Sequence, residues 1–329
     1  HRNLVRTEQG QGEIYRTVLV NKILSLVTLK MASLDPQGVG VEMEADKPNW
    51  YDALNGLPGV IGSSLNEALE IKRNILFLQK HITQQKDHDR AWPVYEELAA
   101  LIDVLNDLLG QQPAPFTFWD QASAAKEAYR EATRYGVSGR ETLVSAKQLE
   151  LFFAACLDKL EQGLQRAWNE EGIPSSYFIN FVEEYRLLQT PQGQAKTNVN
   201  VEHGFLTLAI REKQLPLFLE GPVHYLRTCP GKAAAAALAG KIKRSSLYDK
   251  KLGMYKVNAS LENVPMEVGR ARVFSPGWFE NESIWLHMEY KYLLELLRNE
   301  LFDEFYADFS QTLVPFFDPA MYGRSILEN

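Results

Sequence analysis

The stretch 38–64 holds the residues best suited to acid–base chemistry on a small substrate. It is rich in glycine and combines acidic with aromatic side chains: Glu42, Glu44, Asp46, Trp50, Tyr51 and Asp52, followed by Asn55 and, just beyond the stretch, Glu67. Carboxylic acids transfer protons to and from reacting groups. Aromatic rings present flat apolar faces on which pyranose rings stack. A stretch of this composition between two helical patterns indicates chemistry on a sugar.

Asp52 is the strongest candidate for a general acid. Such an acid needs a pKa raised by burial or by neighbouring negative charge, so that it still carries its proton near neutral pH. Asp52 directly follows Trp50 and Tyr51 and comes shortly after Glu42 and Glu44. The alternative is structural, because aspartates in turn-rich segments also accept hydrogen bonds from backbone amides at turns and helix starts.

The overall composition is that of a globular protein and excludes several classes of partner. Of the 329 residues, 45% are hydrophobic and 11% aromatic, as expected for a chain with a packed core. A net charge of -7 argues against nucleic-acid binding, and no apolar run is long enough to span a membrane. Cys156 and Cys229 are too few for a disulfide framework, so we expect a cytoplasmic protein. The chain starts without an initiating Met, and we expect a piece of a longer protein.

Apolar periodicity predicts about nine helices and little strand. The helices are expected at 13–32, 64–83, 91–109, 118–135, 142–171, 175–188, 232–243, 280–298 and 301–313. A short extended segment around Val39 to Met43 would place Glu42 and Glu44 on one side.

This pattern favours an all-α fold, an (α/α)6 toroid or six-hairpin barrel that is incomplete at its N-terminal side. There is no alternation of strands and helices to indicate a parallel sheet. We expect residues 1–329 to form one partial catalytic domain, with a polar loop or lid at 189–204.

Trp50, Tyr51, Asp52 and Asn55 stand in the order of the W-N-D-x-x-N segment of the cellobiose and chitobiose phosphorylases, which this segment resembles. That family, glycoside hydrolase family ninety-four, folds as an (α/α)6 barrel. It cleaves β-linked disaccharides or short oligosaccharides with inorganic phosphate and inverts the anomeric centre. The resemblance implies that Asp52 is the general acid and that Trp50 lines the sugar pocket. Tyr51 stands where the family has Asn.

The segment 269–278 resembles the region that holds the family's phosphate loop, although Ser275, Pro276 and Gly277 replace its Thr-Gly-Ser signature. The resemblance makes inorganic phosphate the co-substrate, with no cofactor. Guanidinium groups, hydroxyls and free amides bind phosphate. The candidate donors here are Arg270, Arg272, Ser275, the Gly277 amide and His287.

Two other functions stay open. An inverting hydrolase needs a second carboxylate, roughly 6.5–9.5 Å from the acid, to activate water. Glu280 or Glu282 could supply it, although acidic residues at a helix start also favour the helix dipole. The other alternative is a non-catalytic helical domain that binds carbohydrate or a protein.

The remaining expectations concern partners. An oligosaccharide is the expected substrate, and its predicted contacts are Trp50, Tyr51, Asn55, Glu42, Glu44, Tyr255, Lys256 and Trp278. No His, Cys or acidic cluster has metal-ligand spacing, so we expect no metal. We expect no nucleic-acid or membrane partner, and a homodimer is compatible with the sequence.

Overall fold

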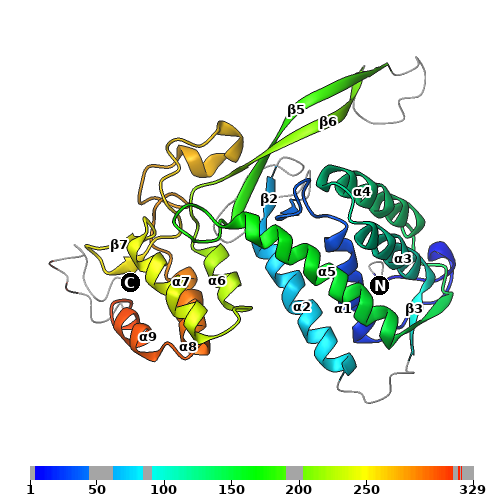
Figure 1. The fold of residues 1–329 in the computed structure, drawn as a ribbon, viewed down its shortest axis with the longest axis horizontal. Coiled ribbons are helices and arrows are strands. Elements are labelled where there is room, and N and C mark those ends of the chain that lie inside the picture. The colour runs from blue at the N-terminus through cyan, green and yellow to red at the C-terminus, as the bar shows by residue number, and fades with distance from the viewer. Residues whose placement is uncertain are drawn as a thin grey trace.

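The computed structural model describes residues 4–43, 62–83, 91–189 and 203–313, together with Asp318 and Ala320. Helices make up about 52% of it and strands 18%. The expected all-α fold, an (α/α)6 toroid, is therefore wrong. The strands include a four-stranded antiparallel sheet, and the architecture is mixed α/β (Figure 1).

The first group of helices packs around one hydrophobic core. It comprises α1 (Leu19–Met31), α2 (Leu65–Thr83), α3 (Glu96–Gln111), α4 (Pro115–Ala132) and α5 (Ala146–Ala167). Helix α3 illustrates why these helices pack together. Its apolar residues at helical spacing form one buried stripe that includes Leu98, Leu101 and Leu105. At the start of α5, Ser145 and Gln148 form a reciprocal capping box.

A second group of helices surrounds a separate core that is rich in aromatic residues. It comprises α6 (Glu220–Leu226), α7 (Lys232–Arg244), α8 (Leu286–Arg298) and α9 (Phe302–Phe309). Tyr177, Phe218, Tyr255 and Tyr292 are fully buried in this core. The short 3-10 turn η1 (Glu8–Gly10) precedes α1. Two others, η2 (Met266–Val268) and η3 (Arg270–Val273), lie between α7 and α8 in the sequence.

The four-stranded sheet lies at the junction of the two cores. Its strands are β1 (Val41–Glu42), β2 (Gly62–Ser64), β5 (Tyr177–Gln189) and β6 (His203–Gln214), in the order β1-β2-β5-β6. Because side chains alternate along a strand, Phe178 packs into the first core, whereas Tyr177 and Ile179 pack into the second. The β5–β6 hairpin extends away from both helix groups (Figure 1).

Two pairs of short strands complete the described elements. β3 (Ala91–Tyr95) pairs with β4 (Glu141–Ser145), and β7 (Tyr248–Asp249) pairs with β8 (Met254–Tyr255), both antiparallel. The helices predicted from 91 and 142 therefore begin later than expected, after β3 and β4.

Two further helix predictions also need correction. The helix predicted at 175–188 is strand β5, whose aromatic and β-branched residues favour a pleated surface. The helix predicted from 280 begins at Leu286, because Phe279 and Glu282 have left-handed backbone angles (φ 46 and 54) that no helix accommodates. Most of the predicted lid, residues 190–202, lies outside the described residues.

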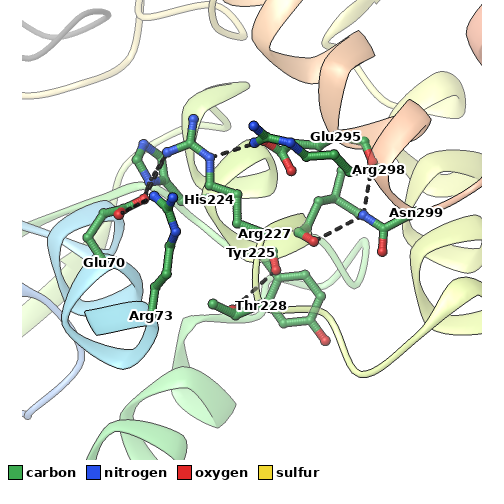
Figure 2. A network of polar contacts seen from close by, with 10 residues as sticks. Glu70, Arg73, His224, Tyr225, Arg227, Thr228, Glu295, Arg298 and Asn299 are labelled. Atoms are coloured by element: carbon green, nitrogen blue, oxygen red, sulfur yellow. Dashed lines mark hydrogen bonds and ion pairs between the residues drawn. The ribbon is translucent and has the colours of Figure 1, made fainter. Parts of the chain in front are cut away.

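A polar network connects the two helix groups (Figure 2). Glu70 on α2 lies 2.8 Å from His224 Nδ1 and accepts a 2.8 Å hydrogen bond from Arg227 Nη1, both on or next to α6. Arg227 Nε also donates to Glu295 on α8, at 3.2 Å. Burial by itself would raise the pKa of Glu70, but the bonds from His224 and Arg227 outweigh it and lower this pKa to about 2. The two groups are thus held together by charge as well as by packing.

No helix in the described part of the chain is both long enough and apolar enough to cross a lipid bilayer.

Candidate functional site

Four polar side chains share one face of the four-stranded sheet. In its register Glu42 lies opposite Ser63, Ser63 opposite Phe178, and Asn180 opposite Glu212. Paired residues in an antiparallel sheet project to the same side. Glu42, Ser63, Asn180 and Glu212 therefore project toward the first helix group, as Phe178 does. We call these four residues, with Asp35 beneath them, the sheet-face site.

Asp35 is almost fully buried, at 1% exposure. Its carboxylate accepts hydrogen bonds from the amides of Val39 (2.9 Å) and Gly40 (2.7 Å) and from the Ser63 hydroxyl (2.7 Å). The Gln37 amide adds a longer bond of 3.1 Å. Burial raises the pKa of Asp35 above its ordinary value, and these donors offset only part of that rise. Donors of this number favour the ionised form of a buried carboxyl group over that of a neighbour with fewer donors.

Glu212 is the partner of Asp35 and keeps its proton. Burial, together with the negative charge of Asp35 and a hydrogen bond between the two groups, raises the pKa of Glu212 to about 9. Two carboxyl groups this close cannot both ionise. Because the donors described above favour the ionised form of Asp35, Glu212 carries the shared proton near neutral pH.

Glu42, a residue singled out from the sequence, belongs to the same site. One carboxylate oxygen accepts a 2.6 Å hydrogen bond from the Trp119 indole, and the other lies 3.7 Å from Lys126 Nζ. Both partners come from α4. Burial raises the pKa of Glu42, and these two donors oppose that effect. The negative charge of Asp35 also acts on Glu42, so the three carboxyl groups form one electrostatic unit.

The sheet-face site lies beside the two residues that flank the acidic, aromatic segment 44–61 in sequence. Met43 follows β1, and its amide donates a 2.9 Å hydrogen bond to the carbonyl of Gly62, the first residue of β2. Met43 and Gly62, the residues that flank segment 44–61, are therefore neighbours. The predicted residues within it, Glu44, Trp50, Tyr51, Asp52 and Asn55, lie outside the described residues.

Some buried polar atoms at this site have no hydrogen-bond partner among the described residues. They are both amide atoms of Asn180 and one carboxyl oxygen of Glu212. Asn180 is only 5% exposed. Most buried polar groups in proteins are hydrogen-bonded. A partner for these atoms would have to come from a bound molecule or from residues outside the described part of the chain.

The other predicted substrate contacts lie in the second helix group. The Tyr255 hydroxyl is buried and donates a 2.8 Å hydrogen bond to Asp308. Lys256 forms a 2.8 Å ion pair with Glu282. Trp278 is 60% exposed and packs edge-on against Phe279. The described contacts of these residues stay within 247–312, and the structure does not bring them together with Glu42.

The predicted phosphate donors are engaged in contacts of their own. Arg270 forms a 2.7 Å ion pair with Glu280, which is itself 2% exposed. Arg272 Nε donates to the Val264 carbonyl, and the Gly277 amide donates to the Asn281 carbonyl. The Ser275 carbonyl accepts from the Trp278 amide, and the His287 ring packs against Trp285. This arrangement favours a structural role for segment 269–287.

Sequence reasoning missed most of the sheet-face site. Asp35 begins a turn-like Asp-Pro-Gln-Gly sequence, and Glu212 lies in a charged run typical of a solvated strand. No motif or spacing in the sequence marks Trp119, Lys126 or Asn180 as a site residue. Among the described residues no group of three or more His, Cys, Asp or Glu side chains is arranged to hold a metal ion.

Comparison with known proteins yields no relative from which a role could be transferred: the chain matches no protein-family model, and no curated protein sequence matches it significantly.

Proposed function

We propose that the protein is a carbohydrate-active enzyme that cleaves a β-linked glucose-type disaccharide or oligosaccharide by inverting phosphorolysis, with Asp52 as general acid. One observation carries the proposal. Met43 and Gly62, which flank the segment that resembles the phosphorylase motif, are joined by a hydrogen bond beside three interacting carboxyl groups.

The chemistry needs a carboxylic acid that is still protonated near neutral pH. Negative charge nearby keeps a carboxylic acid protonated. Asp35 and Glu42 lie beside Met43 and Gly62, the residues that flank the segment, and would supply such charge in their ionised forms. In the proposed reaction Asp52 protonates the departing glycosidic oxygen while phosphate attacks the anomeric carbon from the opposite face. Phosphate is already an anionic nucleophile, so the reaction needs no second carboxylate as base.

Hydrolysis is the competing reaction. It would require a free carboxylate to activate water. The two glutamates predicted for that task, Glu280 and Glu282, are held in ion pairs with Arg270 and Lys256. The predicted phosphate donors are engaged as well, so the preference for phosphorolysis rests on the resemblance of the Asp52 segment to the phosphorylase motif.

Asp52→Asn tests the role of the acid, with Asp46→Asn as the control from the same segment. The amide that replaces the carboxylic acid cannot donate the proton, so we expect turnover to fall by about 10²–10⁴-fold, the usual contribution of general acid catalysis. Sugar binding, measured by calorimetry, should be retained, and Asp46→Asn should keep its turnover. Unchanged turnover in Asp52→Asn would exclude the proposed role. Sugar binding without any turnover in the wild type would identify a binding domain.

A further inference from the structure

A small cavity lies between the turn after α1, the start of α4 and the middle of α5. Its volume is about 190 Å³, and its lining includes Gln37, Gly38, Phe118, Lys159 and Arg166. Pockets for drug-sized ligands span about 300–1,000 Å³. A water molecule takes about 30 Å³. This cavity therefore fits one small polar group with a few waters.

Lys159 is the central cation of this cavity. It is half-buried, and its ammonium group lies 4.6 Å from the centre of the Phe118 ring. Among the described residues it forms no ion pair with a carboxylate. Gly38 makes room for it: the glycine has φ 71, and a Cβ there would lie 3.1 Å from Lys159 Cε. The chain thus brings a cation that has no direct carboxylate contact among the described residues into a partly enclosed space.

Arg166 adds a second positive charge from the same helix. It follows Lys159 by seven residues, which is about two helical turns, so both side chains lie on one face of α5. Arg166 Nη1 donates a 2.7 Å hydrogen bond to the Gln37 carbonyl, which fixes the guanidinium at the cavity. Burial and then the charge of Arg166 lower the pKa of Lys159, and the negative charge of Asp35 offsets part of this effect. The two cations repel each other, and an anion between them would remove that cost.

The rest of the lining is compatible with an anion. Asp158 carries the one negative charge among the lining residues, and it accepts a 2.8 Å hydrogen bond from Gln162 at the exposed rim. The N-terminus of α4 begins at Pro115, also in the lining, without a side-chain cap. A helix N-terminus has partial positive charge, so α4 adds to the field of the two cations.

We propose that this cavity binds a phosphate dianion, either free or as the terminal group of a small monoester, through Lys159 and Arg166. Arginine and lysine are the common partners of phosphate, the first through a planar fork and the second as a point charge. The site is distinct from the sheet-face site. It does not rest on the proposed glycoside cleavage and would stand if that activity were absent.

Titration calorimetry tests the proposal with inorganic phosphate and with glucose 6-phosphate, at constant ionic strength kept with chloride. We expect saturable binding at a site that depends on Lys159, apart from any phosphate bound where the proposed glycoside cleavage takes place. Binding of both ligands would assign the phosphate group itself as the ligand, and binding of glucose 6-phosphate alone would assign a monoester. Absence of binding for both would overturn the proposal.

Three variants locate the bound anion. Lys159→Met keeps the length and the contact with Phe118 but removes the charge, and it should weaken binding at least tenfold. Lys147→Met removes an exposed lysine of the same helix outside the cavity, and binding should not change. Arg166→Gln alters an exposed side chain, so it decides the question if Lys159→Met does not fold. Binding that is unchanged in Arg166→Gln, or equally weak in Lys147→Met, would contradict the assignment.

Discussion

Glu212 donates a hydrogen bond to Asp35, joining strand β6 to the turn that follows α1. The two carboxyl groups titrate as a unit, with Asp35 held in its ionised form by backbone amides and Ser63. The proton on Glu212 is therefore part of the folded structure at neutral pH. This relationship places a buried charge and a buried proton beside β1 and β2, the strands that flank the acidic segment in sequence.

The raised pKa of Glu212 predicts a pH-dependent stability. Its folded pKa is about 9, above the ordinary value near 4.5 that applies when the chain is unfolded. Between these values the folded protein holds a proton that the unfolded chain has lost. The stabilisation is fully present below about pH 4.5 and is lost as the pH rises through about 9, by at most about 1.4 kcal/mol per pH unit.

Glu212→Gln should flatten this dependence, because glutamine keeps a donor for Asp35 and does not titrate. The measurement is the free energy of unfolding in urea across that pH window. Glu184→Gln, at an exposed position on β5, is the control and should keep the wild-type slope. Burial raises the pKa of Glu289 to about 8. This group therefore also makes the free energy of unfolding fall with rising pH, equally in the wild type and in both variants. An unchanged slope in Glu212→Gln would contradict the shared proton.

The network around Glu70 predicts the opposite dependence at low pH. The pKa of Glu70 is lowered to about 2, so its contribution is present above the ordinary value near 4.5 and is lost as the pH falls through about 2. Glu70→Gln removes the charge that His224 and Arg227 bind. At neutral pH we expect a loss of about 1–2 kcal/mol in the free energy of unfolding, less than for a fully buried pair because Glu70 is partly exposed.

The matched control is Glu127→Gln, which removes an exposed pair with Arg130 on α4. It should change the free energy of unfolding by less than about 0.5 kcal/mol. Equal effects of the two variants would show that the Glu70 network does not hold the helix groups together.

The Trp119–Glu42 hydrogen bond predicts a specific cost for removing the indole N–H. Trp119→Phe keeps an aromatic ring but leaves one oxygen of the partly buried Glu42 without its donor. We expect a loss of about 1–2 kcal/mol, the usual effect of removing a partner from a buried polar group. Trp278→Phe, at a 60% exposed position, should cost less than about 0.5 kcal/mol. Chemical denaturation of both variants makes the comparison, and a similar loss for both would remove Trp119 from the site.

Two glycines in helices of the first group predict opposite effects of alanine. At Gly163 in α5 a Cβ would lie 2.0 Å from the Gly38 carbonyl oxygen, so Gly163→Ala must displace the turn that carries Asp35 and should cost about 1–3 kcal/mol. At Gly110 in α3 nothing lies within 4 Å of an added Cβ. Gly110→Ala should stabilise the protein by about 0.5 kcal/mol, since alanine favours helix. Thermal unfolding of the two variants checks both signs, and a neutral Gly163→Ala would contradict the close approach of α5 to this turn.

The sequence predicted the helices better than the strands, and the reason is physical. The stripe of Leu98, Leu101 and Leu105 has only one interpretation, because one face of α3 is buried in one core. In β5 the apolar residues Tyr177, Phe178 and Ile179 are consecutive, because the strand contacts a different core on each face. A continuous apolar run does not distinguish a strand from a buried helix.

The candidate site was predictable only where its residues are close in sequence. Glu42 was found because it lies in a conspicuous acidic stretch. Asp35 and Glu212 meet only through the pairing of β2, β5 and β6, which no local pattern encodes. Conversely, Tyr255 and Lys256 have the residue types of a sugar site, yet their partners Asp308 and Glu282 engage them within the second helix group.

The most direct test of the proposed function is ³¹P NMR of the chain incubated with a β-linked glucose disaccharide and inorganic phosphate. Inverting phosphorolysis predicts that α-glucose 1-phosphate accumulates, that no cleavage occurs without phosphate, and that Asp52→Asn forms none. Release of free glucose at the same rate with and without phosphate would contradict phosphorolysis and assign a hydrolase.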